Sequence, residues 1–491
     1  MAGRTLDDGT THLVTTDNTT AKSLQLAPQA VDDLAPIAVQ TIAELRGDNP
    51  SLLAFPYGLD TYRSGEDKAE TLRLFSLHPQ EAGAWSLATG NVMGFVGRNN
   101  TQLTITSRFA KDDAHDFFLH HMLHKVFRLN IVNFQVRTDL RDNIYDFLLY
   151  LFPSHLMPAM RQGLYKEYRR IKHNDANVKG AIDVARHLKR NIPFAGKIAY
   201  NTREYRYDNA VTQLVRHTIE HIKAHPWGRS TLRNSTEMSD AVNQIEFHTL
   251  GYNRNERGRV INANLTHPVT HPYFTEWRRL QQLCLRILRH DKLTYGREKG
   301  KVYGLIFDGA WLWEEYLDVM FREIGEEIKH PCNKERKGRD TLFKDGQEIY
   351  PDFIKVKEPD GKNVLTAHFV ADAKYKRIDK RGEEASREDY YQVTTYMYRY
   401  ECNRASLLFP YDGDDKSDVK DENGIYKKTR CFLGARAHQP AENADCKRCL
   451  FELGLPVPQG HSDFKEFATE MDAKAREGLG WLVSQVNEKS E

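Results

Sequence analysis

A strong turn signal between two strand-like segments constrains the fold of this chain most. Apolar and charged side chains alternate over residues 353–357, as they do along a half-buried β-strand. Residues 358–362 (EPDGK) are typical of a turn, and residues 364–375 continue as a strand with an apolar bias. We therefore predict a β-hairpin in this part of the chain.

Acidic and basic side chains lie at matching positions on this hairpin. Asp352, which follows Pro351, and Asp372 are almost equally far from the turn, so their Cβ atoms are expected about 5 Å apart across the strands. Lys374 lies two residues after Asp372 and shares its face of the strand. Two carboxylates and a lysine in this arrangement can hold Mg²⁺ against a phosphodiester and activate a water molecule. The pattern predicts a metal-dependent nuclease site, and an ordinary solvated hairpin face is the alternative.

Helices are predicted on both sides of the hairpin. Residues 307–328 carry apolar side chains at helical spacing, with Glu314 and Glu315 among them. One of these two acids is expected to face the hairpin as a further metal-site carboxylate. Residues 384–404 form the second predicted helix, and the basic run at residues 374–381 before it suits contacts with phosphate groups.

The segment resembles the PD-(D/E)xK nuclease superfamily. More closely, it resembles the McrC family, the nuclease subunit of McrBC-type modification-dependent restriction systems, including LlaJI-like relatives. The matching pieces are residues 304–317 (GLIFDGAWLWEEYL), 350–352 (YPD), 372–376 (DAKYK) and 392–396 (QVTTY). Weaker matches in the N-terminal and middle regions are residues 89–97, 103–109, 116–127, 179–183, 191–194 and 203–209. Together these cover about residues 51–456, most of the chain.

The resemblance implies a role for each residue of the site. Asp352 and Asp372 are expected to bind Mg²⁺, with Glu314 as the helix-borne acid of the metal site and Glu315 as the second choice. Lys374 is expected to orient or deprotonate the attacking water. The implied activity is hydrolysis of DNA phosphodiesters, with one or two metal ions.

The resemblance also implies supporting residues and a substrate. Gln392 and Tyr396 would match the Gln-x-x-x-Tyr helix that follows the lysine in this superfamily. That helix supports the site and approaches the DNA backbone. The expected substrate is DNA with modified bases, cut in the course of anti-phage defence.

A separate partner is expected because the sequence has no Walker A motif. The resemblance implies an McrB-like AAA+ GTPase that forms a hexameric ring, binds the GTP and has its hydrolysis stimulated by this chain. Residues 29–290 would form the stalk and ring contact, with the strands near residues 91–106 as the candidate insert. Two alternatives stay open: an autonomous DNA repair exonuclease with the same core, and a scaffold subunit whose core is inert.

Composition fits a cytoplasmic globular protein. The 491 residues are 40% hydrophobic and 28% charged, with a net charge of only +2, so any DNA-binding surface must be local. No apolar run is long enough for a membrane span, and no signal peptide is visible. Six scattered cysteines predict free thiols in a reducing compartment. Zinc at Cys446 and Cys449, with Cys431 and His438 nearby, is a minor alternative.

The expected fold is a multidomain α/β chain. Residues 1–28 are polar and expected to be disordered or loosely attached. The predicted domains are a strand-rich N-terminal domain at 29–135, a helical middle region at 136–290, a PD-(D/E)xK domain with a mixed sheet flanked by helices at 301–456, and a C-terminal helical tail at 457–491. Helices in the middle region are expected at residues 144–151, 158–171, 209–224 and 271–289.

Overall fold

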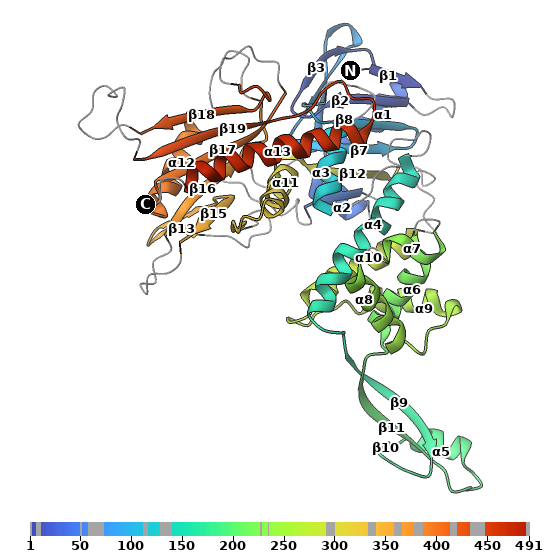
Figure 1. The fold of residues 1–491 in the computed structure, drawn as a ribbon. Helices are drawn as coiled ribbons and strands as arrows, with labels where there is room; N and C mark the ends of the chain where they lie inside the picture. The colour runs from blue at the N-terminus through green and yellow to red at the C-terminus, as the bar shows by residue number, and fades with distance from the viewer. Residues whose placement is uncertain are drawn as a thin grey trace. The chain divides into compact units, whose positions relative to one another are not determined.

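The computed structural model, drawn as a ribbon in Figure 1, divides the chain into two compact units. One unit joins Met1–Val136 with Gly296–Glu491, and the other spans Arg137–Tyr295. The described residues are 2–5, 11–49, 52–56, 73–110, 116–127, 140–225, 228–233, 235–290, 300–331, 340–357, 366–377, 386–412, 420–432 and 447–487. Within these ranges, no helix combines the length with the apolar character that a membrane span requires.

A six-stranded sheet, called the N-terminal sheet below, forms one part of the first unit. Its order is β1-β2-β8-β7-β12-β4. Its strands are β1 (Ala2–Thr5), β2 (Thr11–Thr16), β4 (Leu52–Phe55), β7 (Val92–Arg98), β8 (Thr101–Thr106) and β12 (Val302–Asp308). Strand β12 pairs with β7 and β4, although it lies about two hundred residues later in the chain. The predicted boundary at residue 301 therefore does not separate two sheets.

One sequence-based expectation about this sheet is wrong. The described part of residues 1–28 is not loosely attached, because β2 pairs along its length with β8 and buries Leu13. Sheet hydrogen bonds fix this polar segment, since they need backbone groups and few apolar side chains. The strands near residues 91–106, the candidate insert into the partner ring, are β7 and β8, which are paired on both edges within the sheet, and their role as an insert stays a prediction.

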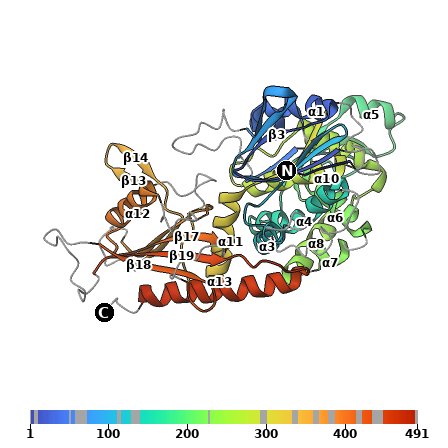
Figure 2. The ribbon, with the colours of Figure 1, turned by 90° about the horizontal axis from the view of Figure 1, so that it is seen from above.

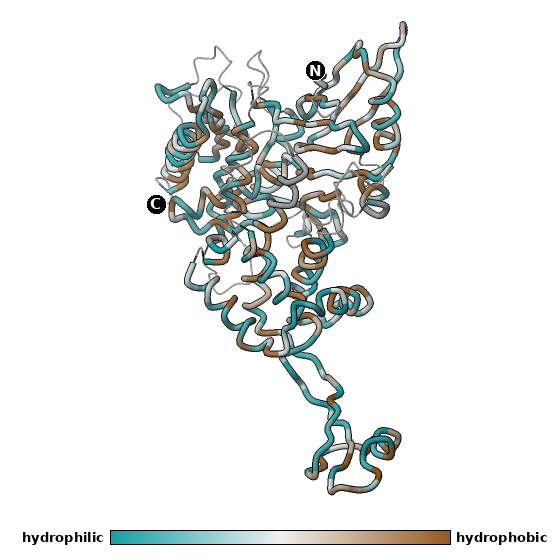
Figure 3. The backbone as a smooth tube through the Cα atoms, turned by 90° about the vertical axis from the view of Figure 1, so that its right-hand side faces the viewer, coloured by the Kyte–Doolittle hydropathy of each residue, from teal (hydrophilic) through white to brown (hydrophobic). Residues whose placement is uncertain are grey.

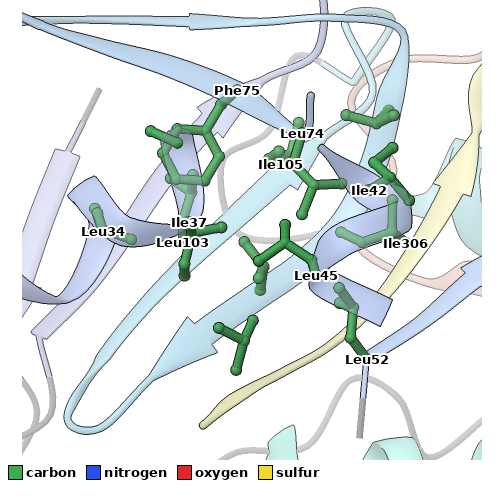
Figure 4. Packing of buried hydrophobic residues seen from close by; sticks show 14 of the residues in the cluster. Leu34, Ile37, Ile42, Leu45, Leu52, Leu74, Phe75, Leu103, Ile105 and Ile306 are labelled. Atoms are coloured by element: carbon green, nitrogen blue, oxygen red, sulfur yellow. The ribbon is translucent and has the colours of Figure 1, made fainter. Parts of the chain in front are cut away.

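A small sheet and two helices cover one face of the N-terminal sheet. The small sheet has the order β3-β6-β5. The elements are β3 (Thr20–Leu24), α1 (Pro28–Ala38), α2 (Ile42–Asp48), β5 (Phe75–Pro79), the 3-10 turn η2 (Glu81–Gly83) and β6 (Trp85–Thr89). Figure 4 shows their side chains packed around Leu34, Ile37 and Leu45. Burial of this apolar cluster is the main force that holds the layer together.

Helix α11 (Gly309–Glu323) begins where β12 ends. Asp308 stops the strand and caps the helix, since its side chain accepts hydrogen bonds from the backbone N–H groups of Ala310 and Trp311. Helix α3 (Phe117–Phe127) packs against α11. The helix predicted over residues 307–328 is confirmed, with a later start and an earlier end.

A five-stranded mixed sheet, called the C-terminal sheet below, forms the rest of the first unit. Its order is β15-β16-β17-β19-β18. Its strands are β15 (Phe353–Val356), β16 (Ala367–Ala373), β17 (Arg404–Tyr411), β18 (Tyr426–Cys431) and β19 (Cys449–Pro456). The three inner strands are parallel, and both edge strands are antiparallel to their neighbours. A separate hairpin pairs β13 (Asp340–Phe343) with β14 (Gly346–Ile349).

Helices α12 (Arg387–Arg399) and α13 (Phe464–Asn487) cover opposite faces of the C-terminal sheet (Figure 2). Leu450 of β19 belongs to the core cluster under α12. Its neighbour Phe451 meets Trp481 of α13, with ring centroids 5.9 Å apart. Successive residues of a strand point to opposite faces, so β19 binds both helices. The α/β class and both helices agree with the sequence-based expectation.

The second unit contains a group of packed helices. They are α4 (Leu140–Arg161), α6 (Ala210–Ala224), α7 (Gly228–Thr231), α8 (Thr236–His248), the 3-10 turn η3 (Arg254–Glu256), α9 (Arg257–Thr266) and α10 (Thr275–His290). The helices predicted at residues 144–151, 209–224 and 271–289 correspond to α4, α6 and α10.

Residues 167–206 of the second unit form a β-ribbon with a short helix, called the arm below. Its elements are β9 (Glu167–Asp175), β10 (Ala181–Ile182), α5 (Val184–Arg190) and β11 (Ile198–Arg206). The strands of the arm are largely hydrophilic in Figure 3, and hydrophobic segments reappear at its tip. The helix predicted over residues 158–171 is wrong after residue 161, because β9 pairs with β11 along its whole length. This pairing overrides the local helical pattern.

Candidate active site

The predicted hairpin is present and brings the two aspartates together. Strands β15 and β16 are antiparallel with Phe353 opposite Ala371, and the same register places Asp352 opposite Asp372. Oδ2 of Asp352 accepts a hydrogen bond of 2.8 Å from the backbone N–H of Ala373. Both carboxylates are buried, with 8% of Asp352 and 2% of Asp372 exposed. The turn at residues 358–362 lies outside the described residues.

Lys374 points into the same site. Its Nζ lies 2.5 Å from Oδ2 of Asp372 and donates a hydrogen bond of 2.8 Å to Oε1 of Gln392. Asp389 is a third partner, with its Oδ1 3.6 Å from Nζ. Lys374 and Asp372 share a face of the chain, as their spacing predicts. The ammonium group is therefore held between a strand and helix α12.

Burial and mutual repulsion disfavour the charged forms of the two aspartates. Burial, together with the charges of Glu314 and Asp372, raises the pKa of Asp352 well above its usual range. Burial also raises the pKa of Asp372, although the neighbouring Lys374 opposes this shift. Burial alone would lower the pKa of Lys374, but the adjacent carboxylates outweigh it and raise that pKa. The site thus combines two buried carboxylates with the adjacent ammonium group of Lys374.

Glu314 and Glu315 lie on α11 but face different groups. Glu314 is only 6% exposed, and its charge acts on Asp352. Glu315 instead pairs with His330, whose Nε2 is 3.4 Å from Oε1. Nδ1 of His330 hydrogen-bonds to the backbone carbonyl of Asp352 at 2.8 Å. Of these two acids on α11, Glu314 is therefore the one whose charge acts on the pKa of Asp352.

Gln392 and Tyr396 lie one turn apart on α12, as predicted. Oε1 of Gln392 accepts the hydrogen bond from Lys374, and its Nε2 donates one of 2.7 Å to the Tyr396 hydroxyl. Ser386 caps this helix through a reciprocal pair of hydrogen bonds with Asp389. The basic run at residues 374–381 is described only up to residue 377.

Sequence reasoning missed two residues of the site. Asp389 completes the capping box of α12 and also contacts Lys374 and Lys376. The Ser-x-x-Asp pattern of a capping box could have revealed it. His330 supports the Asp352 backbone, and its ion pair with Glu315 outweighs burial and raises its pKa to about 8. No sequence signal identifies His330, because its partners are distant in the chain.

The donor groups suit a hard divalent cation, although their geometry is open. Among the described residues, no three His, Cys, Asp or Glu side chains are grouped closely enough to hold a metal ion as they stand. Asp352, Asp372 and Glu314 nevertheless supply the carboxylate oxygens that Mg²⁺ prefers. When ionised, these three acids outnumber the one ammonium group of Lys374, so an added cation would balance the charge.

The cysteines differ in part from the expectation. Cys449 is a buried free thiol, as are Cys284 and Cys402. Cys431 is disulfide-bonded, so the expectation of thiols throughout is wrong at this position. Cys446 and His438 lie outside the described residues, and the zinc alternative stays untested.

Residues 87–410 match the model of a protein family described as McrBC 5-methylcytosine restriction system component. The match covers well over half of the 491 residues. The chain belongs to this family. The matched range includes α11, the β15–β16 hairpin and α12, so every predicted site residue of this McrBC family member lies within it. The resemblance to McrBC-type restriction systems that the motifs indicated is confirmed.

Two solved structures from Thermococcus gammatolerans resemble this McrBC family member loosely. One is a refined half-complex from a tetradecameric assembly of McrB AAA+ hexamers with bound McrC. It has 15% sequence identity, covers 96% of this chain and 100% of that chain, and gives a TM-score of 0.46. The other is a cryo-EM structure of the McrBC complex, with 16% identity, coverage of 65% and 89%, and a TM-score of 0.30. No curated protein matches the chain.

Proposed function

We propose that the protein is the Mg²⁺-dependent DNA endonuclease subunit of an McrBC-like restriction complex. The observation that carries this proposal is the meeting of Asp352, Asp372 and Lys374 at one hairpin, with Glu314 close to Asp352. A mixed sheet with helices on both faces supports a PD-(D/E)xK core. Membership of the McrBC family supports the role in restriction.

Asp352, Asp372 and Glu314 would hold the metal, with the backbone carbonyl of Ala373 as a further oxygen ligand. Small side-chain rotations would have to close the site around the ion, because the three acids are not yet grouped as ligands. A bound Mg²⁺ would polarise the scissile phosphate and lower the pKa of a water molecule. The hydrogen bond from the N–H of Ala373 would orient the Asp352 carboxylate.

Lys374 would orient or deprotonate the attacking water and balance charge in the transition state. Its ammonium group now contacts Oδ2 of Asp372, an oxygen that a metal would use. Lys374 would leave this oxygen on metal binding and keep its hydrogen bond to Gln392. Gln392 would thereby hold the ammonium group beside the water.

The arm is the element that we propose contacts a ring-shaped AAA+ GTPase partner. Ten Lys and Arg and four Asp and Glu give residues 167–206 a net charge of +6, whereas the whole chain carries only +2. Large apolar side chains at its tip are exposed, namely Val184, Leu188, Ile192 and Phe194. Exposed apolar side chains gathered on one element mark a protein contact. McrB AAA+ hexamers bind McrC in the similar solved complex, which supports this kind of partner.

A cleavage assay tests the nuclease proposal. The chain, its McrB-like partner, GTP and Mg²⁺ should cut methylated DNA, and Asp352→Ala and Lys374→Ala should each abolish cutting while GTPase stimulation persists. The control is Asp345→Ala, which removes an exposed acid between β13 and β14. Full cutting by Asp352→Ala would refute the site. Cutting without partner would favour an autonomous exonuclease, and no cutting by the unaltered chain would favour a scaffold.

A second assay tests the arm. Leu188→Asp and Phe194→Asp should lose co-purification with the partner and stimulation of its GTPase, because each places a charge in an apolar contact. The control is Phe343→Asp, which alters a similarly exposed aromatic side chain on β13. Undiminished GTPase stimulation by both arm variants would contradict the assignment.

A further inference from the structure

Tyr375 directly follows Lys374, but its side chain is buried in the N-terminal part of the first unit. Its hydroxyl lies 2.8 Å from Oγ of Ser107 and 3.1 Å from Sδ of Met93. Its ring meets that of Phe109 edge-on, with centroids 5.3 Å apart. All of these contacts are to β7 or to the segment just after β8. The residue beside Lys374 is therefore attached to the N-terminal sheet rather than to its own sheet.

Ser107 is itself firmly held. It is fully buried, and its backbone N–H donates a hydrogen bond of 2.5 Å to Oδ2 of Asp116. Its Oγ accepts a hydrogen bond of 3.2 Å from the N–H of Phe109. Asp116 also accepts a hydrogen bond of 2.9 Å from the N–H of Leu119 in the first turn of α3. The Ser107 hydroxyl is thus fixed between the end of β8 and the start of α3.

A second connection follows two residues later. The guanidinium group of Arg377 donates a hydrogen bond to the backbone carbonyl of Arg108 and lies 3.1 Å from Oδ2 of Asp412. The guanidinium group of Arg108 lies 5.0 Å from the centre of the Tyr375 ring and pairs with the buried Asp17. Both ends of the short segment after Lys374 are therefore tied to the same surface.

Helix α11, which carries Glu314, is also attached to the N-terminal sheet. Its first residue, Gly309, donates a backbone hydrogen bond of 2.8 Å to the carbonyl of Asn91 next to β7. The strand before it, β12, is an inner strand of the N-terminal sheet. This sheet therefore sets the positions of Lys374 and of Glu314 at once.

We infer that Tyr375 is a positioning residue for Lys374 and that it acts through its hydrogen bond to Ser107. The inference rests on the proposed nuclease function. Lys374 has a long side chain, so its ammonium group reaches the attacking water only if the backbone below it is fixed. Its backbone N–H donates a hydrogen bond of 2.8 Å to the carbonyl of Leu408, and Tyr375 fixes the other side of the residue. The N-terminal sheet is in this way part of the catalytic scaffold.

A double-mutant cycle on cleavage tests the inference. Tyr375→Phe and Ser107→Ala should each lower kcat roughly two- to tenfold, the range expected for one hydrogen bond. KM for DNA and stimulation of the partner GTPase should not change, since both side chains are buried away from solvent. The reduction in the double variant should be clearly smaller than the product of the two single reductions, because both substitutions remove the same hydrogen bond and differ only in the contacts with Met93 and Phe109.

The matched control is Tyr316→Phe. Tyr316 is equally buried, and among the described residues its hydroxyl has no hydrogen-bond partner. Removal of the Tyr316 hydroxyl should leave kcat unchanged. This control separates the removal of a buried hydroxyl from the loss of one hydrogen bond.

Three results of these cleavage assays would overturn the positioning role of Tyr375. Unchanged kcat in Tyr375→Phe and Ser107→Ala, with Lys374→Ala inactive, would overturn the positioning role and leave the nuclease proposal intact. Reductions that multiply in the double variant would also overturn it. Full cutting by Lys374→Ala would overturn the nuclease proposal, and the positioning role with it. If Tyr375→Phe unfolds below the assay temperature, Ser107→Ala tests the same hydrogen bond, because it removes the other partner.

Discussion

Gly309 lies so close to Tyr375 that a Cβ atom on the glycine would come within 2.7 Å of Cε1 of the tyrosine ring. The ring has little freedom to withdraw, because its hydroxyl is bound to Ser107. Gly309 is the first residue of α11, the helix that carries Glu314. The missing side chain at residue 309 is therefore what lets this helix approach the segment that follows Lys374.

Gly309→Ala should destabilise the protein by about 1–3 kcal/mol, the usual cost of overpacking a filled site. Urea unfolding measures this change in the free energy of unfolding. The control is Gly480→Ala within α13, where a Cβ would meet nothing within 4 Å. That substitution should stabilise the protein by roughly 0.5–1 kcal/mol, because alanine loses less entropy in a helix. A Gly309→Ala variant as stable as the unaltered protein would contradict the close packing.

The buried ion pair of Arg108 and Asp17 should be costly to break from one side. Asp17 is fully buried, and both Nε and Nη2 of Arg108 donate hydrogen bonds to it. Asp17→Ala should destabilise the protein by about 3–5 kcal/mol, because it leaves a buried charge unpaired.

The control for this ion pair is Glu256→Ala. It breaks an exposed pair with Arg259 and should change the free energy of unfolding by less than about 1 kcal/mol. Chemical unfolding compares the two variants. Equal changes in the free energy of unfolding would show that burial does not strengthen the ion pair of Asp17 and Arg108.

Asp116 should make stability depend on pH. Burial raises its pKa from 3.8 to about 6, although hydrogen bonds from Leu119 and Ser107 oppose the shift. A raised pKa in the folded state means that protonation favours folding. Its contribution is fully present below about pH 4 and is lost as the pH rises through 6, a change of roughly 3 kcal/mol.

Asp116→Asn should remove this contribution. The difference in unfolding free energy between the protein and the variant, followed from pH 4 to pH 7, isolates the residue from other titrating groups. A pH-independent difference would mean that Asp116 keeps an ordinary pKa when buried.

Mg²⁺ should stabilise the folded protein in the absence of DNA or partner. A ligand at one hundred times its dissociation constant contributes about 2.7 kcal/mol, which thermal unfolding detects as a higher Tm. Asp372→Asn should abolish this shift, since it removes a carboxylate proposed to bind the ion. Asp345→Asn, at an exposed acid, should keep it. A shift of equal size in Asp372→Asn would exclude this residue as a ligand.

Gln392→Ala should slow cleavage about tenfold without unfolding the protein, because Lys374 loses a hydrogen bond worth roughly 1 kcal/mol or more. Single-turnover cleavage measures the rate. The control on the same helix is Tyr398→Ala, where the side chain is 81% exposed. Equal rates for Gln392→Ala and the unaltered chain would show that Asp372 and Asp389 hold the ammonium group without Gln392.

The sequence alone predicted the secondary-structure elements whose signals lie within a few consecutive residues. The hairpin follows from a turn signal between two strand patterns, and its register places Asp352 opposite Asp372. Helices α11 and α12 follow from helical spacing of apolar side chains. Lys374 and Asp372 share a face because they are two residues apart in a strand. Local geometry therefore predicts which charged groups share this hairpin, whereas contacts with distant segments fix the final position of Lys374.

Features that depend on distant partners could not be predicted. Helical spacing leaves Glu314 and Glu315 equivalent, although the family resemblance ranks Glu314 first. The packing of α11 decides that the charge of Glu314 acts on Asp352 while Glu315 pairs with His330. The helical pattern before residue 171 gives way to β9 because β11 pairs with it. Such choices depend on the free energy of contacts between segments far apart in the chain, which no local pattern contains.

The amino-acid order by itself determined the hairpin, its acids, its lysine and the two flanking helices, because turns and periodicity act over a few residues. Tertiary structure alone decided that β12 joins the N-terminal sheet and that Tyr375 bonds to Ser107. These contacts bury polar groups between segments more than two hundred residues apart. They form only where the assembled fold supplies a partner for each buried group.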